Sequence, residues 1–423
     1  MKIKELILYR EPGHPDILEA MAAFVEQGAE APFDPYETAG KLVEFSAAHG
    51  FKGNLWHDFL AYVLATNENA FSTACEIRGA VEGTVNALAL HDFSIFREWF
   101  EYDLEDLDEC LDVRVFGFLK AYESTGTHSQ VFNRRIRDDI QALSESLSAA
   151  DTDGQWHSIL TEFYRRFGVG KFGLHKAFRV EHRKGRAEIV PIKNIEHVYL
   201  DDLVGYESQK RKLIENTEAF VEGREANNCL LFGDSGTGKS SSIKAILHKY
   251  YDKGLRMIEI YKHQFKDLSD VIAQVKNRNY KFIIYMDDLS FEEFEVDYKY
   301  LKAIIEGGLE VKPGNVLIYA TSNRRHLIRE NFSDKEEVRE DMHRSDTVQE
   351  KLSLSSRFGV TIYFGRPEPK EFRAIVTTLA KRAGIDMPEE ELLLLANKWE
   401  LSHGGISGRT AVQFITYLKG TRR

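Results

Sequence analysis

The stretch that most constrains this chain is CLLFGDSGTGKSSSIKAIL, which begins at Cys229. Within it, residues 233–240 match the pattern G-x-x-x-x-G-K-[ST], with an apolar strand pattern before the match and a helical pattern after it. Glycines let a backbone fold closely around phosphate, and the N–H groups at a helix N-terminus supply positive potential. The stretch therefore predicts a phosphate-binding loop, the Walker A motif, between a strand and a helix.

The side chains of this loop have distinct expected roles. We expect Lys239 to reach the β and γ phosphates of ATP and the hydroxyl of Ser240 to ligate Mg²⁺. The nucleotide-binding residues predicted in the loop are Gly233, Asp234, Ser235, Gly236, Thr237, Gly238, Lys239, Ser240 and Ser241. A second glycine pattern, GVGKFG at 168–173, follows a helical pattern instead of the strand that a dinucleotide site requires, so we interpret it as a turn.

A pair of acids ends another apolar run, FIIYM, which is followed by Asp287 and Asp288. In a P-loop site the first acid holds Mg²⁺, so we expect Asp287 to act with Ser240 as the metal-binding pair. Asp288 is then the expected base that polarises the attacking water. Glu292 lies a few residues further on and is the alternative for this role.

Hydrophobic patterning divides the chain into three regions. Residues 1–194 show apolar positions at i, i+3 and i+4, which predict a mainly helical N-terminal region. Residues 195–365 alternate compact apolar runs with helical patterns, as in a parallel sheet covered on both faces. Residues 366–423 hold three further helical patterns, which predict a small lid. The expected fold class is α/β, with a parallel sheet, a helical C-terminal lid and a mainly helical N-terminal region.

Composition narrows the class of protein. With 423 residues, 43% of them hydrophobic, the chain is long enough for two or three domains. A formal net charge of −11 disfavours nucleic acid as a partner, although a local basic patch would permit it. The three cysteines lack disulfide or zinc spacing, and neither a signal peptide nor a membrane-spanning run is evident. We therefore expect a cytoplasmic protein without a membrane partner.

Further motifs appear in the order found in AAA+ ATPases, which residues 203–420 resemble. VLIYATSN ends in Asn323, placed as the first sensor of that family, and SLSSRFGVTIYF places Arg357 as its arginine finger. GGISGRTAVQF resembles the second sensor, with Arg409 on the γ-phosphate. DDLVGYESQK resembles the segment that lines the adenine pocket, around Val204 and Gly205. The resemblance implies an ATPase whose catalytic and sensing set comprises Asp288, Asn323, Arg357 and Arg409, with ATP and Mg²⁺ as cofactors.

A closer resemblance concerns an uncharacterised bacterial AAA+ group, a domain of unknown function. It rests on DDLSFEEFE, YATSNRRHL and HGGISGRTAVQF, and more diffusely on NLWHDFLAYVLATNENAFS in the helical region. This resemblance implies a nucleotide site and indicates little about biological role.

One departure from the AAA+ pattern concerns the second acid, which is usually glutamate. Asp288 is shorter by one C–C bond, about 1.5 Å, and displacements of about 1 Å in a reacting group cost on the order of 100-fold in rate. Either Asp288 activates water less well, or Glu292 reaches back to the site. Aspartate also occurs here in AAA+ initiators and helicase loaders. We therefore expect slow turnover that a partner stimulates.

The predicted finger implies an oligomer. In AAA+ proteins this arginine acts on nucleotide held by the next subunit, so Arg357 predicts a homo-oligomeric ring or filament, most often of six subunits. The target of such an assembly is open. An acidic surface favours remodelling or switching of a protein complex. The basic run at 171–193 keeps a DNA-associated loader as an alternative, and a nucleotide-gated scaffold with little turnover is a third.

Overall fold

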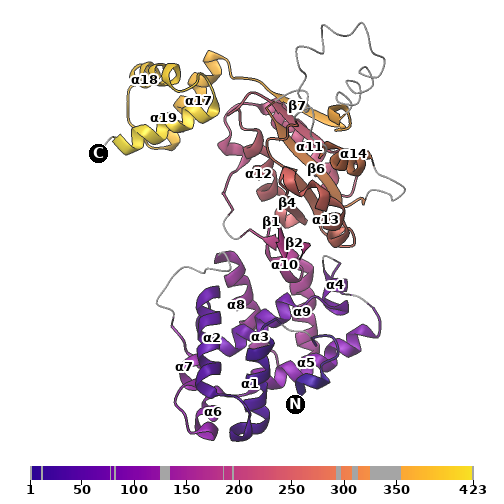
Figure 1. The fold of residues 1–423 in the computed structure, drawn as a ribbon. Coiled ribbons are helices and arrows are strands. Elements are labelled where there is room, and N and C mark those ends of the chain that lie inside the picture. Colours follow the sequence, from indigo (N-terminus) through magenta and orange to yellow (C-terminus); the bar gives the residue numbers. More distant parts are fainter. Residues whose placement is uncertain are drawn as a thin grey trace. The chain divides into compact units, whose positions relative to one another are not determined.

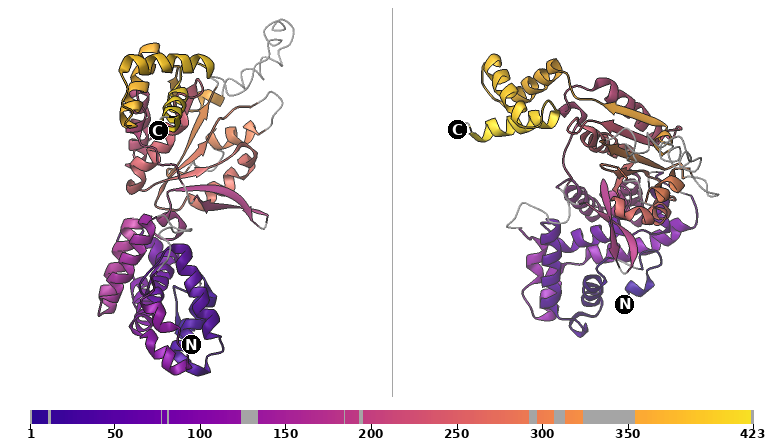
Figure 2. Two further views of the ribbon diagram at one scale, coloured as in Figure 1. Left: turned by 90° about the vertical axis from the view of Figure 1, so that its left-hand side faces the viewer. Right: turned by 45° about the horizontal axis from the view of Figure 1, so that its top comes forward.

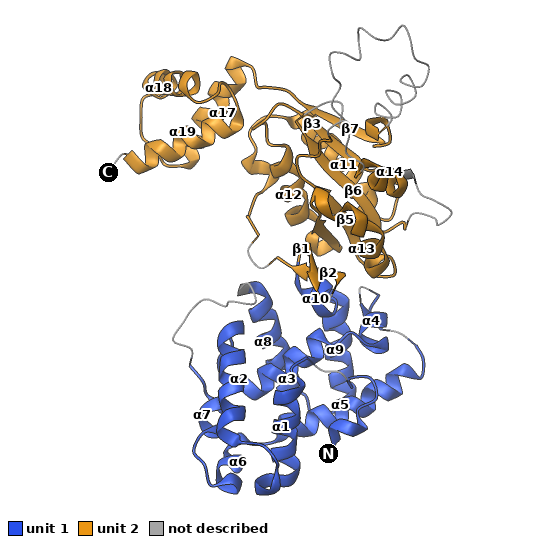
Figure 3. Ribbon diagram, in the orientation of Figure 1, with its two compact units in different colours: residues 1–175 blue, residues 176–423 orange. Residues whose placement is uncertain are grey.

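The computed structural model describes residues 2–10, 13–76, 78–80, 82–123, 134–183, 185–192, 195–291, 297–306, 313–323 and 354–421. The chain divides into two compact units, residues 1–175 and residues 176–423 (Figure 3). Each unit has a hydrophobic core of its own.

The first unit is built from helices packed around an aromatic core (Figure 1). Its α-helices are α1 (Pro15–Gln27), α2 (Pro35–His49), α3 (Leu55–Thr66), α4 (Ala70–Cys75), α5 (Val85–Glu101), α6 (Leu104–Leu111), α7 (Phe116–Lys120), α8 (Arg134–Ser148), α9 (Asp153–Phe167) and α10 (Gly170–Leu174), with 3-10 helices η1 (Lys2–Glu5) and η2 (Gly28–Glu30). Three fully buried tryptophans, Trp56, Trp99 and Trp156, contribute the largest side chains of this core. Burial of such rings is the main term that stabilises the unit.

Polar side chains fix where these helices begin and how the chain enters the unit. Thr152 and Gln155 form a capping box at the start of α9. Asp92 of α5 is fully buried and accepts the N–H groups of Ile7 (2.9 Å), Leu8 (2.7 Å) and Tyr9 (3.1 Å). A buried carboxylate needs such donors, so this contact secures the N-terminal segment against α5.

The second unit contains a seven-stranded sheet with the strand order β2-β1-β4-β5-β6-β3-β7. The strands are β1 (Ala177–Arg183), β2 (Arg186–Pro191), β3 (Cys229–Gly233), β4 (Leu255–Glu259), β5 (Lys281–Met286), β6 (Val316–Ser322) and β7 (Val360–Phe364). All neighbouring pairs are parallel except β1 with β2. Every residue of β6 is buried, as expected for a central strand covered on both faces.

The antiparallel hairpin of β1 and β2 continues the sheet at one edge (Figure 2), where β1 pairs with β4. The division between the units falls before this hairpin, whereas the sequence analysis placed residues up to 194 with the helical region. Pairing of Phe178 with Ile258 joins segments far apart in the chain, which hydrophobic periodicity does not reveal.

Helices flank the sheet, and three further helices follow its last strand in the chain (Figure 1). They are α11 (Glu207–Val221), α12 (Lys239–Tyr250), α13 (Leu268–Val275), α14 (Tyr298–Glu306), α17 (Pro369–Arg382), α18 (Glu389–Ser402) and α19 (Gly408–Thr421), with 3-10 helices η3 (Leu200–Asp202), η4 (Tyr251–Lys253) and η5 (Lys262–Asp267). α11 and α12 share a core with one face of the sheet, and α17, α18 and α19 pack together around Phe372, Val376 and Phe414. The predicted fold class, an α/β core with a small helical C-terminal part and a helical N-terminal region, is confirmed.

Within the part of the chain that the structure describes, no helix combines enough length and apolar character to cross a bilayer.

Candidate functional site

The phosphate-binding loop leaves the carboxyl end of β3 and enters α12, as the motif predicted. Gly233 has φ 134°, and a Cβ there would lie 2.1 Å from the carbonyl oxygen of Phe364 on β7. Gly238, with φ 92°, precedes the first residue of α12. A side chain is excluded at the first position by the neighbouring strand and is strained at the second, so both positions require glycine.

Lys239 is the first residue of α12 and is 6% exposed. Its Nζ donates to the carbonyl oxygens of Gly233 (2.9 Å) and Asp234 (2.6 Å) and to Oδ1 of Asn323 (3.0 Å). Burial lowers the pKa of Lys239, and the nearby carboxylates of Asp234, Asp288 and Asp287 oppose that shift. The ammonium therefore lies at the loop, where a phosphate chain needs a cation.

Ser240 and Asp287 face each other, and the hydroxyl of Ser240 donates to Oδ1 of Asp287 at 2.7 Å. Thr321 of β6 donates to the same oxygen at 2.5 Å. The surrounding protein partly desolvates Asp287 and opposes its ionisation, but hydrogen bonds from Thr321 and Ser240 outweigh this and lower the pKa. An ionised carboxylate beside a hydroxyl is an all-oxygen donor pair, which fits Mg²⁺, an ion that takes few protein ligands and completes its shell with phosphate oxygens and water.

Asp288 and Asn323 meet at the ends of neighbouring strands β5 and β6. The amide Nδ2 of Asn323 donates to Oδ1 of Asp288 at 2.7 Å, while its Oδ1 accepts from Lys239. One amide thus connects the lysine of the loop to the predicted base. This arrangement agrees with a sensing role for Asn323 between the two groups.

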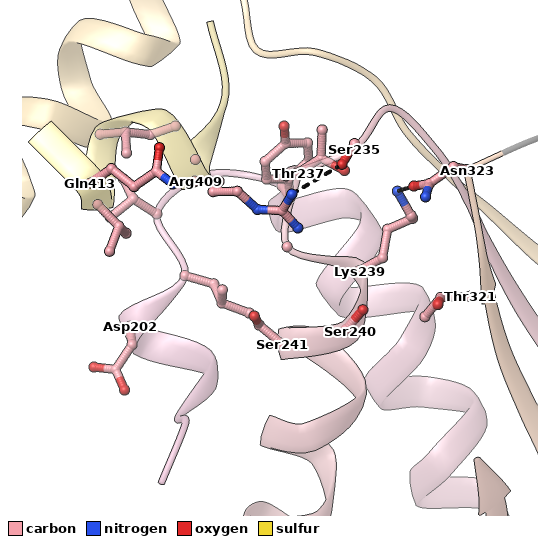
Figure 4. Close-up of a pocket in the computed structure, with 18 of the residues that line it drawn as sticks. Asp202, Ser235, Thr237, Lys239, Ser240, Ser241, Thr321, Asn323, Arg409 and Gln413 are labelled. Carbon is pink, nitrogen blue, oxygen red and sulfur yellow. Dashed lines mark hydrogen bonds between the residues drawn. The ribbon is translucent and has the colours of Figure 1, made fainter. Parts of the chain in front are cut away.

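The C-terminal helices contribute Arg409 to the same site (Figure 4). The backbone N–H of Arg409 donates to the carbonyl oxygen of Gly236 at 3.1 Å, and its guanidinium lies 3.4 Å from Oγ of Ser235. Together the loop, the strand ends and α19 line a pocket of about 700 Å³, which is large enough for a nucleotide.

Part of the pocket lining is apolar. This part comes from Leu203 and Val204 before α11, from Ile375 and Leu379 of α17, and from Val412 of α19. Arg382, in the last turn of α17, donates to the carbonyl oxygens of Asp201 (2.7 Å) and Asp202 (3.1 Å). The guanidinium of Arg382 therefore connects α17 to the segment that contains Val204.

The structure brings most of the predicted site residues into this pocket. The lining includes Val204, Ser235, Gly236, Thr237, Gly238, Lys239, Ser240, Ser241, Asp287, Asp288, Asn323 and Arg409. Gly233, Asp234, Gly205 and Arg357 are not among the lining residues. Glu292 lies outside the described residues, so its predicted role stays a prediction.

Sequence reasoning missed several lining residues. Thr321 lies two positions before Asn323, and alternation along a strand was a signal that it shares a face with that sensor. Ile375 and Leu379 also line the pocket and lie in no motif, while Asp202 and Gln413 lie within DDLVGYESQK and GGISGRTAVQF but were given no role. Where the structure describes the chain, no three or more His, Cys, Asp or Glu side chains cluster as a metal site would require.

The basic run at 171–193 lies partly in the β1–β2 hairpin. Arg179 and Arg183 both contact Glu181, and Arg183 also lies 3.8 Å from Glu188. The charges of these two arginines are therefore paired with glutamates of the same two strands. GVGKFG was interpreted as a turn, but only residues 168 and 169 connect α9 to α10, and residues 170–173 lie within the short helix α10.

Solved structures of low identity are similar to part of this chain. The RuvB Holliday junction branch migration motor of Thermotoga maritima is 16% identical, with a TM-score of 0.38, over 53% of this chain and 65% of that chain. The AAA domain of FIGL-1 in complex with ADP is 18% identical, with a TM-score of 0.37, over 53% of this chain and 73% of that chain. The chain thus spans less than two thirds of the RuvB chain.

No curated protein matches the sequence. The family model described as protein of unknown function, DUF815, matches residues 173–422, which is more than half of the chain. The predicted resemblance to an uncharacterised group of AAA+ P-loop proteins is confirmed, and the chain belongs to the DUF815 family.

Proposed function

We propose that this protein binds Mg-ATP in the pocket at the carboxyl ends of β3, β5 and β6 and hydrolyses it. The observation that carries the proposal is the hydrogen-bonded chain from Lys239 through Asn323 to Asp288, beside the contact of Ser240 with Asp287. A cation, a carboxylate base and an oxygen pair for a metal are the groups that phosphoryl transfer to water requires.

Each side chain then has a defined task. Lys239 exchanges its carbonyl partners for the β and γ phosphate oxygens, and Ser240 and Asp287 hold Mg²⁺. Mg²⁺, when bound, neutralises charge on those phosphates. Asp288 accepts the proton of the attacking water, and Asn323 orients that carboxylate. Arg409 senses the γ-phosphate from α19, so hydrolysis changes the angle between the C-terminal helices and the sheet.

The proposed assembly is a homo-oligomeric ring or filament. Arg357 precedes β7 and does not line the pocket of its own chain. If Arg357 stabilises charge on a transferred phosphoryl group, it therefore does so in the pocket of a neighbouring copy. Such an assembly converts hydrolysis into relative movement of subunits, which suits the remodelling or switching of a protein complex.

A protein target is favoured over nucleic acid by the formal net charge of −11. Arg179 and Arg183 are paired with glutamates of the same hairpin, so these two arginines offer little free charge to phosphates. A nucleotide-gated scaffold is the second candidate, because aspartate at position 288 is shorter than the usual glutamate.

The test is the ATPase rate per subunit as a function of protein concentration, with Mg²⁺ and excess ATP. A rate that rises and saturates supports sites completed between subunits, and a flat rate contradicts assembly-dependent catalysis. Lys239→Ala is the control for contaminating activity. Asp288→Asn is expected to remove turnover while Glu292→Gln retains it, and the reverse result reassigns the base. Tight ATP binding with no turnover favours the nucleotide-gated scaffold over the ATPase.

A further inference from the structure

The turn that follows β5 has an unusual backbone conformation at Asp288, with φ 50°. Within the described residues only His14, Asp112, Tyr206 and Asp288 are non-glycine residues with positive φ. This left-handed region is unfavourable for L-residues, and aspartate and asparagine enter it more readily than most. A cost of this kind persists only where surrounding contacts impose the conformation.

Thr321 of β6 supplies those contacts. The N–H of Asp288 donates to Oγ1 of Thr321 at 2.9 Å, and the N–H of Leu289 donates to its carbonyl oxygen at 2.7 Å. The hydroxyl hydrogen of Thr321 is directed to Oδ1 of Asp287 at 2.5 Å. One residue therefore holds three consecutive positions of the turn.

Thr321 is itself held firmly. It is 2% exposed and pairs with Leu231 of β3 in the parallel register of the sheet. The strand that leads into the phosphate-binding loop therefore pairs directly with the residue that holds the acids. Because Thr321 is fixed in the strand, its hydroxyl holds the turn in a defined position.

We propose that Thr321 is a positioning residue that imposes the left-handed turn at Asp288 and so aims both aspartates at their partners. Asp287 is directed to Ser240, and Asp288 is directed to Asn323, whose Nδ2 lies 2.7 Å away. The same turn explains why the second acid is aspartate, because its short polar side chain suits the left-handed conformation better than that of glutamate. The catalytic part of this inference rests on the proposed ATPase function.

The decisive pair of variants is Thr321→Val and Thr321→Ser. Valine keeps the shape of threonine and removes the hydroxyl, whereas serine keeps the hydroxyl and removes the methyl group. We expect Thr321→Val to lower kcat on the order of 10- to 100-fold and to change KM for ATP less. The reason is that displacement of a reacting group by about 1 Å costs up to about 100-fold in rate. Thr321→Ser should retain most of the wild-type kcat.

Two readouts do not need turnover. The first is the gain in ATP affinity that Mg²⁺ produces in equilibrium binding, which Thr321→Val should reduce several-fold and Thr321→Ser should preserve. The second is amide hydrogen exchange of the peptide covering 287–291 in the nucleotide-free full chain. The amide of Asp288 should exchange at least tenfold faster in Thr321→Val, because its acceptor is lost.

These readouts separate the inference from the proposed function. A wild-type protein that binds Mg-ATP without hydrolysing it contradicts the ATPase proposal, while exchange and Mg²⁺ dependence still decide the role of Thr321. The inference is overturned if Thr321→Val matches wild type in exchange and in Mg²⁺ dependence, or if Thr321→Ser is as impaired as Thr321→Val. Melting temperatures of both variants establish that they are folded.

The turn itself gives an independent test at Asp288. Glutamate is the usual acid at this position in AAA+ ATPases. We nevertheless expect Asp288→Glu to speed amide hydrogen exchange over 287–291. If the wild-type protein hydrolyses ATP, Asp288→Glu should also lower its turnover. Asp288→Asn should leave exchange unchanged, because asparagine tolerates the left-handed region as well as aspartate does. An Asp288→Glu variant with slower exchange and higher turnover than wild type overturns the explanation for aspartate.

Discussion

Lys239 and Asn323 are joined by a 3.0 Å hydrogen bond from Nζ to Oδ1, which links the phosphate-binding loop to the end of β6. The other end of the same amide donates to Asp288. In the proposed mechanism, a phosphate draws Lys239 away from Asn323, which frees the amide oxygen and changes the orientation of the amide that is bonded to Asp288, the proposed base. The amide is therefore in a position to report the γ-phosphate to Asp288.

Removal of this amide should affect turnover more than binding. We expect Asn323→Ala to lower kcat on the order of 100-fold, as loss of a preorganised donor does in other active sites, while KM for ATP changes only a few-fold. Steady-state kinetics measure both constants. Asn397→Ala, an exposed position on α18, is the matched control. A large rise in KM at constant kcat would assign Asn323 to ground-state binding instead.

Arg357 should act on nucleotide held by another copy of the chain. Arg357→Ala and Lys239→Ala are each expected to be inactive alone, because one lacks the finger and the other lacks a competent nucleotide site. Mixing the two should restore part of the ATPase activity, since some sites then combine an intact Arg357 with an intact Lys239. No recovery at any mixing ratio, in mixtures shown to co-assemble, argues against a finger in trans.

Arg382 should control nucleotide affinity through the segment before α11. Its guanidinium donates to the carbonyl oxygens of Asp201 and Asp202, next to the apolar wall that contains Val204. We expect Arg382→Ala to weaken ATP binding several-fold by equilibrium titration, because the loss of these charged hydrogen bonds loosens that wall. Arg373→Ala, exposed on the same helix, should bind ATP like wild type. Equal affinities for both variants contradict the prediction.

Asp58 should make the stability of the helical unit depend on pH. Burial raises the pKa of Asp58 to about 6 from an ordinary 3.8, although hydrogen bonds from Ser144 and Gln141 oppose the shift. Since the folded state favours the protonated acid, its stabilising contribution is complete below about pH 4 and is lost as pH rises through about 6. The loss is on the order of 3 kcal/mol at neutral pH.

Urea unfolding followed by tryptophan fluorescence measures this effect, since Trp56, Trp99 and Trp156 of the four tryptophans lie in the helical unit. Asp58→Asn, which stays neutral, should be more stable than wild type at pH 8, with a difference that shrinks toward pH 4. Asp151→Asn, at an exposed position, is the control. A difference that is constant from pH 4 to pH 8 would contradict the shifted pKa.

Local sequence determined much of the nucleotide site. The glycine pattern at 233–240 and the acids after FIIYM are short-range signals whose chemistry depends on neighbouring residues. Parallel strands end at the same edge of a sheet, and Lys239, Asp287 and Asn323, which lie beyond the ends of such strands, meet in one pocket. The role of Arg409 came from its resemblance to a family motif, and the structure places it against the loop.

Only the tertiary structure decided the contacts that hold these groups in place. Thr321 meets Asp288 across 33 positions of sequence, and Arg382 meets Asp201 across 181. The left-handed turn at Asp288 and the pairing of β1 with β4 arise from such distant partners. Sequence alone specified which chemical groups the site contains, because motifs are local. Packing specified how the side chains of these groups are oriented, because a hydrogen bond depends on where distant strands and helices are fixed relative to each other.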